Sequence, residues 1–113
     1  MIRPEHLRPR RHEEQDTQTA ILQWLATQQA YLRVWRNNCG GVGRVIFGVP
    51  GQADISGLLL GGRRLEIEVK SRRGVQSKEQ VAFQQMIESM GGLYVLARSV
   101  DDVKNALGGL VDG

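Results

Sequence analysis

Acidic and lysine side chains on two neighbouring segments are the groups best suited to chemistry in this sequence. Asp54 lies near the start of one segment. In the other segment, Glu66, Glu68 and Lys70 alternate with apolar residues. Alternate side chains of a strand point to the same face, so the three charged groups of the second segment share a face. A solvated antiparallel strand often has the same pattern, and the spacing by itself leaves a structural and a functional interpretation open.

A glycine pair predicts how the two segments meet. The segments 53–60 and 63–70 flank Gly61-Gly62, which is typical of a tight hairpin turn between antiparallel strands. This pairing brings Asp54 close to Glu68, with a lysine beside them. Two carboxylates, completed by water and substrate phosphate, commonly hold Mg²⁺, and a lysine can orient or activate the attacking water. The pattern predicts hydrolysis of a phosphodiester with Mg²⁺ or Mn²⁺ as cofactor.

A third carboxylate is predicted on the first helix. Apolar residues at helical spacing predict a helix over 13–29, and Ile21 and Leu25 lie on its buried stripe. Glu14 and Gln18 extend this stripe toward the start of the helix. Polar residues that continue a buried stripe indicate a site, although a hydrated first turn of the helix would give the same pattern.

The remaining elements must hold these groups in place. The chain is expected to form a strand over 31–36, a glycine-rich turn over 37–43, a loop over 48–51, a helix from Ser77 to the pair Gly91-Gly92, a strand over 93–97 and a helix over 100–107. Because a helix precedes the strand at 93–97, this strand is expected to pair parallel with a neighbour in an otherwise antiparallel sheet. The predicted fold is mixed α/β, in the order α-β-β-β-α-β-α.

Composition predicts one small domain. The chain has 113 residues, of which 41% are hydrophobic and 24% are charged, and this size allows one hydrophobic core.

No apolar run approaches the roughly 20 residues that a membrane span needs, and residues 1–12 are too polar for a signal peptide, so a cytoplasmic location without a membrane is expected. Cys39 is the single cysteine, and the sequence has no zinc-binding spacing. Any metal is therefore expected to sit on oxygen ligands.

All of the net charge lies at the start of the chain. Residues 1–12 hold four Arg and one Glu, a charge of +3, whereas acidic and basic residues balance over 13–113. We expect 1–12 to be a flexible basic arm and 13–113 to be the domain. Such an arm indicates a polyanion partner, or else a solubilising tail.

Four separated elements resemble, in order, the VRR-NUC branch of the PD-(D/E)XK nuclease superfamily. They are Gly51-Gln52-Ala53-Asp54, Glu68-Val69-Lys70, Ser77-Lys78-Glu79-Gln80 and Gly91-Gly92-Leu93-Tyr94-Val95-Leu96-Ala97-Arg98-Ser99. The resemblance runs from Glu14 to Leu107, and its specificity comes from the order of the four elements. It implies a restriction-endonuclease-like mixed β-sheet flanked by helices and a metal-dependent endodeoxyribonuclease.

The resemblance also implies roles for individual residues. Asp54 and Glu68 would ligate the metal together with the backbone carbonyl of Val69. Lys70 would assist the attacking water, and Glu14 matches the glutamate on the first helix of the family.

One position departs from the family pattern. The family has Pro-Asp where this chain has Ala53-Asp54. Proline would fix φ and stiffen the turn that presents the aspartate, whereas alanine leaves the turn freer. We expect weaker preorganisation of the site with the ligand itself retained.

Gln80 matches the glutamine of the last family motif, and a second role is also open to it. Ser77 and Gln80 have the spacing of a capping box, in which the two side chains satisfy backbone N–H groups at the start of a helix. Gln80 also shares a stripe with Phe83 and Ile87, which would turn its side chain toward the site. The functional hypothesis is that Gln80 contacts Lys70 or a bound phosphate.

DNA is the expected partner. Polar and basic side chains near the proposed site in sequence are predicted to bind it: Gln18, Arg36, Arg44, Arg72 and Arg73. Stand-alone family members from phages and bacteria are similar in size, form homodimers and look like Holliday-junction resolvases, so the resemblance implies a homodimer acting on branched DNA in a bacterial or phage-infected cell. The alternatives are a non-catalytic DNA-binding or assembly module, and a nuclease for flaps, linear duplex or RNA.

Overall fold

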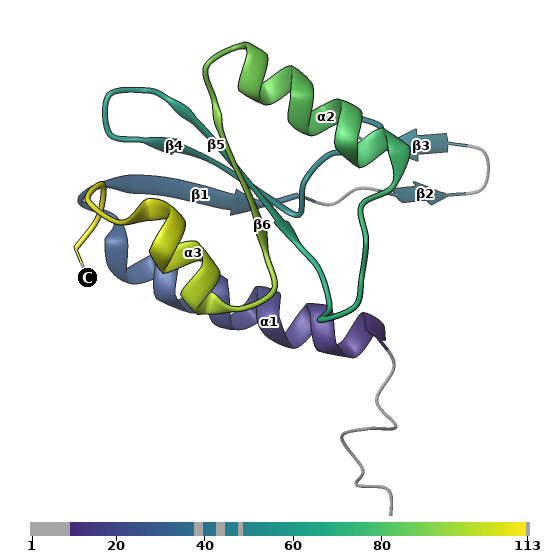
Figure 1. Ribbon diagram of the computed structural model, residues 1–113, viewed down its shortest axis with the longest axis horizontal. Coiled ribbons are helices and arrows are strands. Elements are labelled where there is room, and N and C mark those ends of the chain that lie inside the picture. Colours follow the sequence, from purple (N-terminus) through teal and green to yellow (C-terminus); the bar gives the residue numbers. More distant parts are fainter. Residues whose placement is uncertain (1–9, 38–39, 43–44, 48, 113) are drawn as a thin grey trace, which may run out of the picture.

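A four-stranded mixed β-sheet with helices on both faces forms the centre of the molecule (Figure 1). The computed structural model describes residues 10–37, 40–42, 45–47 and 49–112. In chain order the elements are α1 (Arg10–Leu25), the 3-10 helix η2 (Ala26–Gln28), β1 (Leu32–Arg36), β2 (Gly40–Val42), β3 (Val45–Phe47), β4 (Ile55–Leu59), β5 (Arg64–Val69), α2 (Lys78–Ser89), β6 (Leu93–Ala97) and α3 (Val100–Leu107). No helix of the described ranges is long and apolar enough to cross a membrane.

The strand order is β1-β4-β5-β6. β1 pairs antiparallel with β4, and β4 with β5, whereas β5 and β6 run parallel. α2 connects β5 to β6, and a helical crossover of this kind is what allows successive strands of a sheet to be parallel. The predicted mixed α/β architecture and the parallel pairing of the strand at 93–97 are confirmed.

The β4–β5 hairpin pairs the two predicted segments, but its turn is one residue longer than predicted, because Leu59 pairs with Arg63 and Leu60 lies in the turn with the two glycines. Ile55 lies opposite Ile67, and both glycines of the connecting turn have a φ of 97°. Glycine adopts positive φ without the steric penalty that a Cβ imposes, so the pair closes the turn readily. Asp54, which directly precedes β4, is thereby placed beside Glu68 of β5.

The sheet is covered on both sides, by α1 with α3 on one face and by α2 on the other (Figure 1). Leu65, Ile67 and Val69 of β5 belong to the larger core under α1 and α3. Glu66 and Glu68 lie on the α2 side and are only 0% and 2% exposed. The interpretation of this charged strand face as solvated is therefore wrong for both glutamates.

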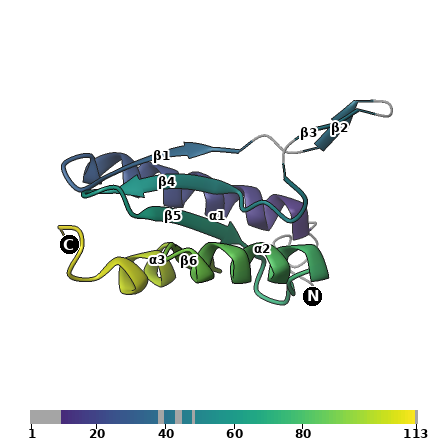
Figure 2. The same cartoon turned by 90° about the horizontal axis from the view of Figure 1, so that it is seen from above.

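One helix boundary and one connection differ from the prediction. α1 begins at Arg10, so the last three residues of the predicted basic arm are helical, and it ends at Leu25, where η2 follows. The predicted turn over 37–43 contains β2, which pairs with β3 in a separate two-stranded ladder. Within the described residues, five strands and not the predicted three therefore lie between α1 and α2. Glycine weakens a strand, but it keeps the backbone donor and acceptor that a ladder requires. This hairpin extends beyond one end of the four-stranded sheet (Figure 2).

Candidate functional site

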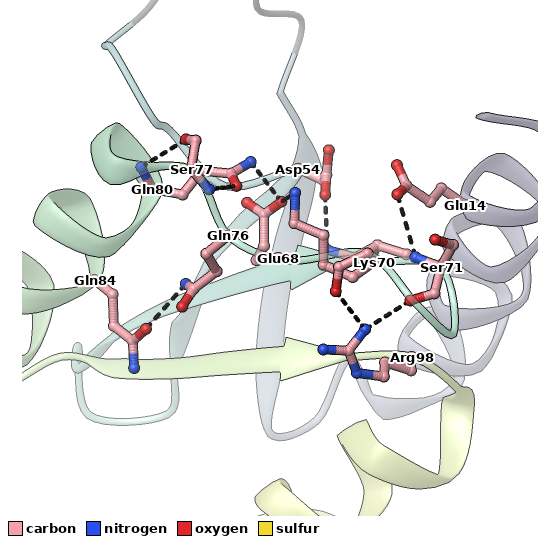
Figure 3. Close-up of polar contacts among 12 residues, drawn as sticks. Glu14, Asp54, Glu68, Lys70, Ser71, Gln76, Ser77, Gln80, Gln84 and Arg98 are labelled. Atoms are coloured by element: carbon pink, nitrogen blue, oxygen red, sulfur yellow. Dashed lines mark hydrogen bonds and ion pairs between the residues drawn. The ribbon is translucent and has the colours of Figure 1, made fainter. Parts of the chain in front are cut away.

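Asp54 and Glu68 meet at one end of the four-stranded sheet (Figure 3). Oδ2 of Asp54 accepts a 2.7 Å hydrogen bond from the backbone N–H of Val69. This bond ties the aspartate side chain to the end of β5, directly after Glu68. The structure thus brings together the two carboxylates that the hairpin register predicts to be neighbours.

Gly51 shapes the turn that leads to Asp54. Its φ is 74°, and a Cβ at this position would lie 2.1 Å from the backbone oxygen of Glu79 in α2. Any side chain here would be strained and would push the turn away from the helix. The glycine therefore lets the turn pack against the start of α2 while it presents the aspartate to β5.

Glu68 carries an unsatisfied oxygen. Its Oε2 accepts a 2.9 Å hydrogen bond from Nε2 of Gln80 and lies 3.5 Å from Nζ of Lys70. Its Oε1 is buried and has no hydrogen-bond partner among the described residues. Buried polar atoms are normally paired, because an unpaired one costs about 1–3 kcal/mol. Oε1 therefore marks a position where a ligand of the carboxylate is expected.

The pKa values of both carboxyls are raised. Burial, and then the nearby charge of Asp54, raises the pKa of Glu68 to about 7, although Lys70 acts in the opposite direction. Burial also raises the pKa of Asp54 above its ordinary value; the hydrogen bond from Val69 opposes this rise, and Glu14 adds to it. A cation beside these groups would stabilise their charged forms and lower both pKa values. Such perturbed pairs are common at functional sites.

Two glutamates at the start of α1 hold the loop that follows β5. Oε1 of Glu14 accepts a 3.2 Å hydrogen bond from the N–H of Ser71, and Oε1 of Glu13 accepts a 2.9 Å bond from the N–H of Arg72. The charge of Glu14 also raises the pKa values of both carboxyls at the sheet end. Glu14 is therefore a third carboxylate near the site, as expected. Glu13 lies off the apolar stripe of α1, so periodicity offers no signal for its role.

The side chain of Gln80 caps the start of α2 and also contacts the acidic site. Its Oε1 accepts a 2.8 Å bond from the N–H of Ser77, whose Oγ accepts a 3.1 Å bond from the N–H of Gln80. These two bonds complete the capping box of α2. The amide nitrogen of the same side chain donates to Glu68 (Figure 3). The protein group that Gln80 contacts in the site is thus the carboxylate of Glu68, and not Lys70 as hypothesised from the sequence.

The two contacts of Gln80 can be separated by mutation. Gln80→Ala is expected to lower the free energy of unfolding by about 1 kcal/mol, through the lost cap. It is also expected to slow the metal-dependent DNA cleavage that the sequence resemblance implies about 10-fold, through the lost contact to Glu68. Ser77→Ala is the matched control, since it also breaks the capping box but does not touch the carboxylate. Urea unfolding and cleavage rates of both variants test this. Equal cleavage rates in the two variants would leave Gln80 with the capping role alone.

Arg98 fixes the same loop from the end of β6. Its Nη1 donates to the backbone oxygens of Ser71 and Gly74, at 2.6 and 2.8 Å (Figure 3). The loop after β5 is therefore held by α1 on one side and by Arg98 on the other. An arginine after a strand has no distinctive spacing, and the sequence predicts no role for it.

The donor atoms of the site fit a hard cation. Asp54 and Glu68 offer carboxylate oxygens, one of which is the buried Oε1 without a partner, and oxygen donors are those that Mg²⁺ and Mn²⁺ prefer. Among the described residues, no three His, Cys, Asp or Glu side chains are grouped so that they could hold an ion by themselves. The residues present therefore fit an ion that takes its further ligands from backbone oxygen, water or phosphate, as Mg²⁺ usually does.

The predicted DNA-binding residues lie in two places. Arg72 and Arg73 are exposed on the loop after β5. Gln18 of α1 and Arg36 at the end of β1 line one surface hollow of about 300 Å³. The charge of Arg36 acts to lower the pKa of the carboxyl that directly precedes β4. Arg44 lies outside the described residues.

The start of α1, the β4–β5 hairpin and the start of α2 thus bring three carboxylates, a lysine and a glutamine amide to one end of the sheet. Comparisons of the chain with models of protein families, with curated proteins and with solved structures give no match.

Proposed function

We propose that this protein is a divalent-metal-dependent DNA endonuclease with a restriction-endonuclease-like fold. The observation that carries the proposal is the pairing of half-buried Asp54 with buried Glu68, with an unpartnered Oε1 on Glu68 and the ammonium of Lys70 3.5 Å from its other oxygen. A half-buried and a buried carboxyl with raised pKa values, next to a lysine, suit a site that binds a cation and a phosphate.

Asp54 and Glu68 would hold Mg²⁺ or Mn²⁺ together with the backbone carbonyl of Val69. The ion, when bound, supplies Lewis-acid polarisation of the phosphate and a water of lowered pKa. Gln80 keeps the Glu68 carboxylate in place through its bond to Oε2. The hydrogen bond from Val69 does the same for Asp54.

Lys70 would act on the attacking water and on the reacting phosphate. Its side chain is 13% exposed, so its ammonium lies largely out of solvent beside the carboxylates. A fixed cation in such surroundings stabilises the negative charge that develops on phosphate oxygens in the transition state. Its N–H groups can also orient the water that attacks phosphorus. Glu14 lies near enough to influence both carboxyls and would act as an outer carboxylate.

DNA would be held by its phosphates. Arg72 and Arg73 are exposed on the loop that directly follows Lys70, and Arg36 borders the hollow beside α1. Arginine binds phosphate oxygens in a planar, two-pronged geometry, and such contacts orient DNA without reading its sequence. The loop with Arg72 is tied to α1 through Glu13, which gives these cations a defined position relative to the site.

Branched DNA is the substrate we propose, with two copies of the chain acting together. A four-way junction presents two equivalent strands, and a two-fold symmetric dimer would place one site on each. The family resemblance supports this substrate class. Light scattering at working concentration is expected to give the mass of a dimer, and a monomer would count against paired cleavage.

Cleavage of a labelled four-way junction beside a linear duplex of the same arms tests the function. We expect paired symmetric nicks in Mg²⁺ or Mn²⁺, and none in EDTA or with Asp54→Asn. Salt must be held fixed, because phosphate contacts make DNA affinity steeply salt-dependent. Equal cutting of flaps, duplex or RNA would replace the junction with a broader substrate. Binding of the junction without any metal-dependent cutting would favour a non-catalytic module and overturn the proposal.

A further inference from the structure

A second polar network lies immediately behind the carboxylate pair and centres on Asn37, the residue after β1. The backbone N–H of Asn37 donates a 2.8 Å hydrogen bond to the carbonyl of Asp54. Its side-chain Nδ2 donates 2.8 and 2.7 Å bonds to the carbonyl of Ala53 and to Oγ of Ser56. Asn37 therefore binds the chain just before Asp54, at Asp54 itself and just after it.

The far side of this network is deeply buried. Oγ of Ser56 donates a 2.7 Å hydrogen bond to Oε2 of Glu66, and Oε1 of Glu66 accepts a 2.7 Å bond from Nε of Arg64. Ser56 and Glu66 are both 0% exposed. The network thus links the end of β1, through β4, to a carboxylate fixed in the middle of the sheet.

Donor and acceptor counting fixes the orientation of the Asn37 amide. The carbonyl of Ala53 can only accept a hydrogen bond, and the single hydrogen of the Ser56 hydroxyl is directed to Glu66. Both groups therefore require a donor, and the NH₂ of the amide supplies two. A rotated amide would set its oxygen against the Ala53 carbonyl, so one orientation is strongly preferred.

The hydrogen bonds of Asn37 act on the backbone at Ala53 and Asp54. Ala53 leaves φ free at a position where a proline would fix it. Asn37 restrains this turn by holding the carbonyls of Ala53 and Asp54, while the Asp54 side chain is held separately by the N–H of Val69. Two strands on opposite sides of β4 thus define where the Asp54 carboxylate lies.

We infer that Asn37 is a positioning residue for Asp54, which keeps the aspartate at the place where it can share a metal ion with Glu68. The inference rests on the proposed function. Loss of groups that orient a metal ligand commonly weakens metal binding 10–100-fold without removing any ligand. Asn37 itself contributes no ligand, so it should set the affinity for the ion and leave the chemistry of the loaded site unchanged.

Mn²⁺ alone is the probe, with binding measured by calorimetry or by the loss of the free-ion EPR signal. Asn37→Ala is expected to bind Mn²⁺ about 10-fold more weakly than wild type. In cleavage assays the Mn²⁺ concentration at half-maximal rate should rise by the same factor, while the rate at saturating Mn²⁺ stays within about 3-fold of wild type. A purely structural role would lower the amount of folded protein without this shift in metal dependence.

Ser56→Ala is the matched control. It removes the link to Glu66 but keeps both bonds from Asn37 to the carbonyls of Ala53 and Asp54. We expect lower thermal stability and Mn²⁺ affinity within about 2-fold of wild type, since changes that leave the ligand-orienting bonds intact have little effect on the metal. Asn37→Ser keeps the backbone bond and offers a shorter side-chain donor, so its Mn²⁺ affinity should lie between those of wild type and Asn37→Ala. This variant replaces Asn37→Ala in the test if Asn37→Ala does not fold.

The possible results are distinguishable. Normal Mn²⁺ binding by Asn37→Ala, or an equal loss in Asn37→Ala and Ser56→Ala, overturns the positioning role and leaves the nuclease function standing. Wild-type protein that binds no Mn²⁺ overturns the metal-dependent function, and the positioning role with it.

Discussion

Replacing Lys70 with alanine should slow metal-dependent DNA cleavage by about 10²–10³-fold, the usual cost of losing one preorganised group that stabilises transition-state charge. Nζ of Lys70 lies 3.5 Å from Oε2 of Glu68, and the two side chains are only 13% and 3% exposed, so the charge acts in a poorly solvated site. Both carboxylates remain in this variant. Mn²⁺ should therefore still bind, and the loss should fall on the rate at saturating metal.

The Lys70 experiment is best made at pH 8.5. Lys70 lowers the pKa of Glu68, and its removal would keep more of that carboxyl protonated at neutral pH and weaken metal binding indirectly. Lys78→Ala is the matched control, because it removes the same charge from an exposed position at the start of α2. A Lys70→Ala rate within about 10-fold of wild type would contradict a direct role in the chemistry.

Glu68→Gln should lose cleavage and gain stability in the same protein. Cleavage should fall about 10³-fold, because a neutral amide is a poor replacement for a metal-binding carboxylate. Stability should rise at alkaline pH in EDTA, because the folded protein then no longer has to bury an ionised carboxylate. The amide still offers an oxygen to Nε2 of Gln80.

The pH dependence of this stability gain has a defined sign. The pKa of Glu68 is about 7 in the folded protein, against an ordinary value of 4.5. The stabilisation that comes with the proton is complete below the lower value and is lost as the pH rises through 7. Glu68→Gln avoids this loss, so its free energy of unfolding should exceed that of wild type at pH 8.5 by about 1–2 kcal/mol. The difference should disappear near pH 4.5.

Urea unfolding in EDTA at both pH values measures the difference. Glu88→Gln, at an exposed position near the end of α2, is the matched control and should show no comparable gain at pH 8.5. Excess Mn²⁺ should raise the free energy of unfolding of the wild-type protein at pH 8.5, because a ligand that binds only the folded state stabilises it. The same addition should not stabilise Glu68→Gln. If the wild-type protein were more stable than Glu68→Gln at pH 8.5 in EDTA, the predicted cost of burying the ionised Glu68 carboxylate would be wrong.

Several parts of the fold could be predicted because short-range patterns report them. The period-two pattern of β5 and the glycine pair at 61–62 predict the hairpin, and its pairing places Asp54 beside Glu68. The capping pair of Ser77 and Gln80 marks the start of α2. Each depends on residues only a few positions apart, whose backbone conformations are coupled directly.

Other features depend on tertiary packing. The alternating charges of β5 fit a solvated strand equally well, and only the placement of α2 over that face decides that Glu66 and Glu68 are buried. The strand at Gly40–Val42 forms through backbone pairing with β3, which glycine composition conceals.

The sequence by itself thus determined the strands of the four-stranded sheet and the helices that cover it, the pairing of the β4–β5 hairpin and the identity of the acidic pair. The tertiary structure alone decided which polar groups hold that pair in place. Glu13 reaches across 59 residues to Arg72, and Asn37 across 16 to Ala53. Periodicity describes which side of an element is buried. A hydrogen bond between segments that are far apart in the sequence depends on how whole elements pack, and no local spacing of residues encodes that packing.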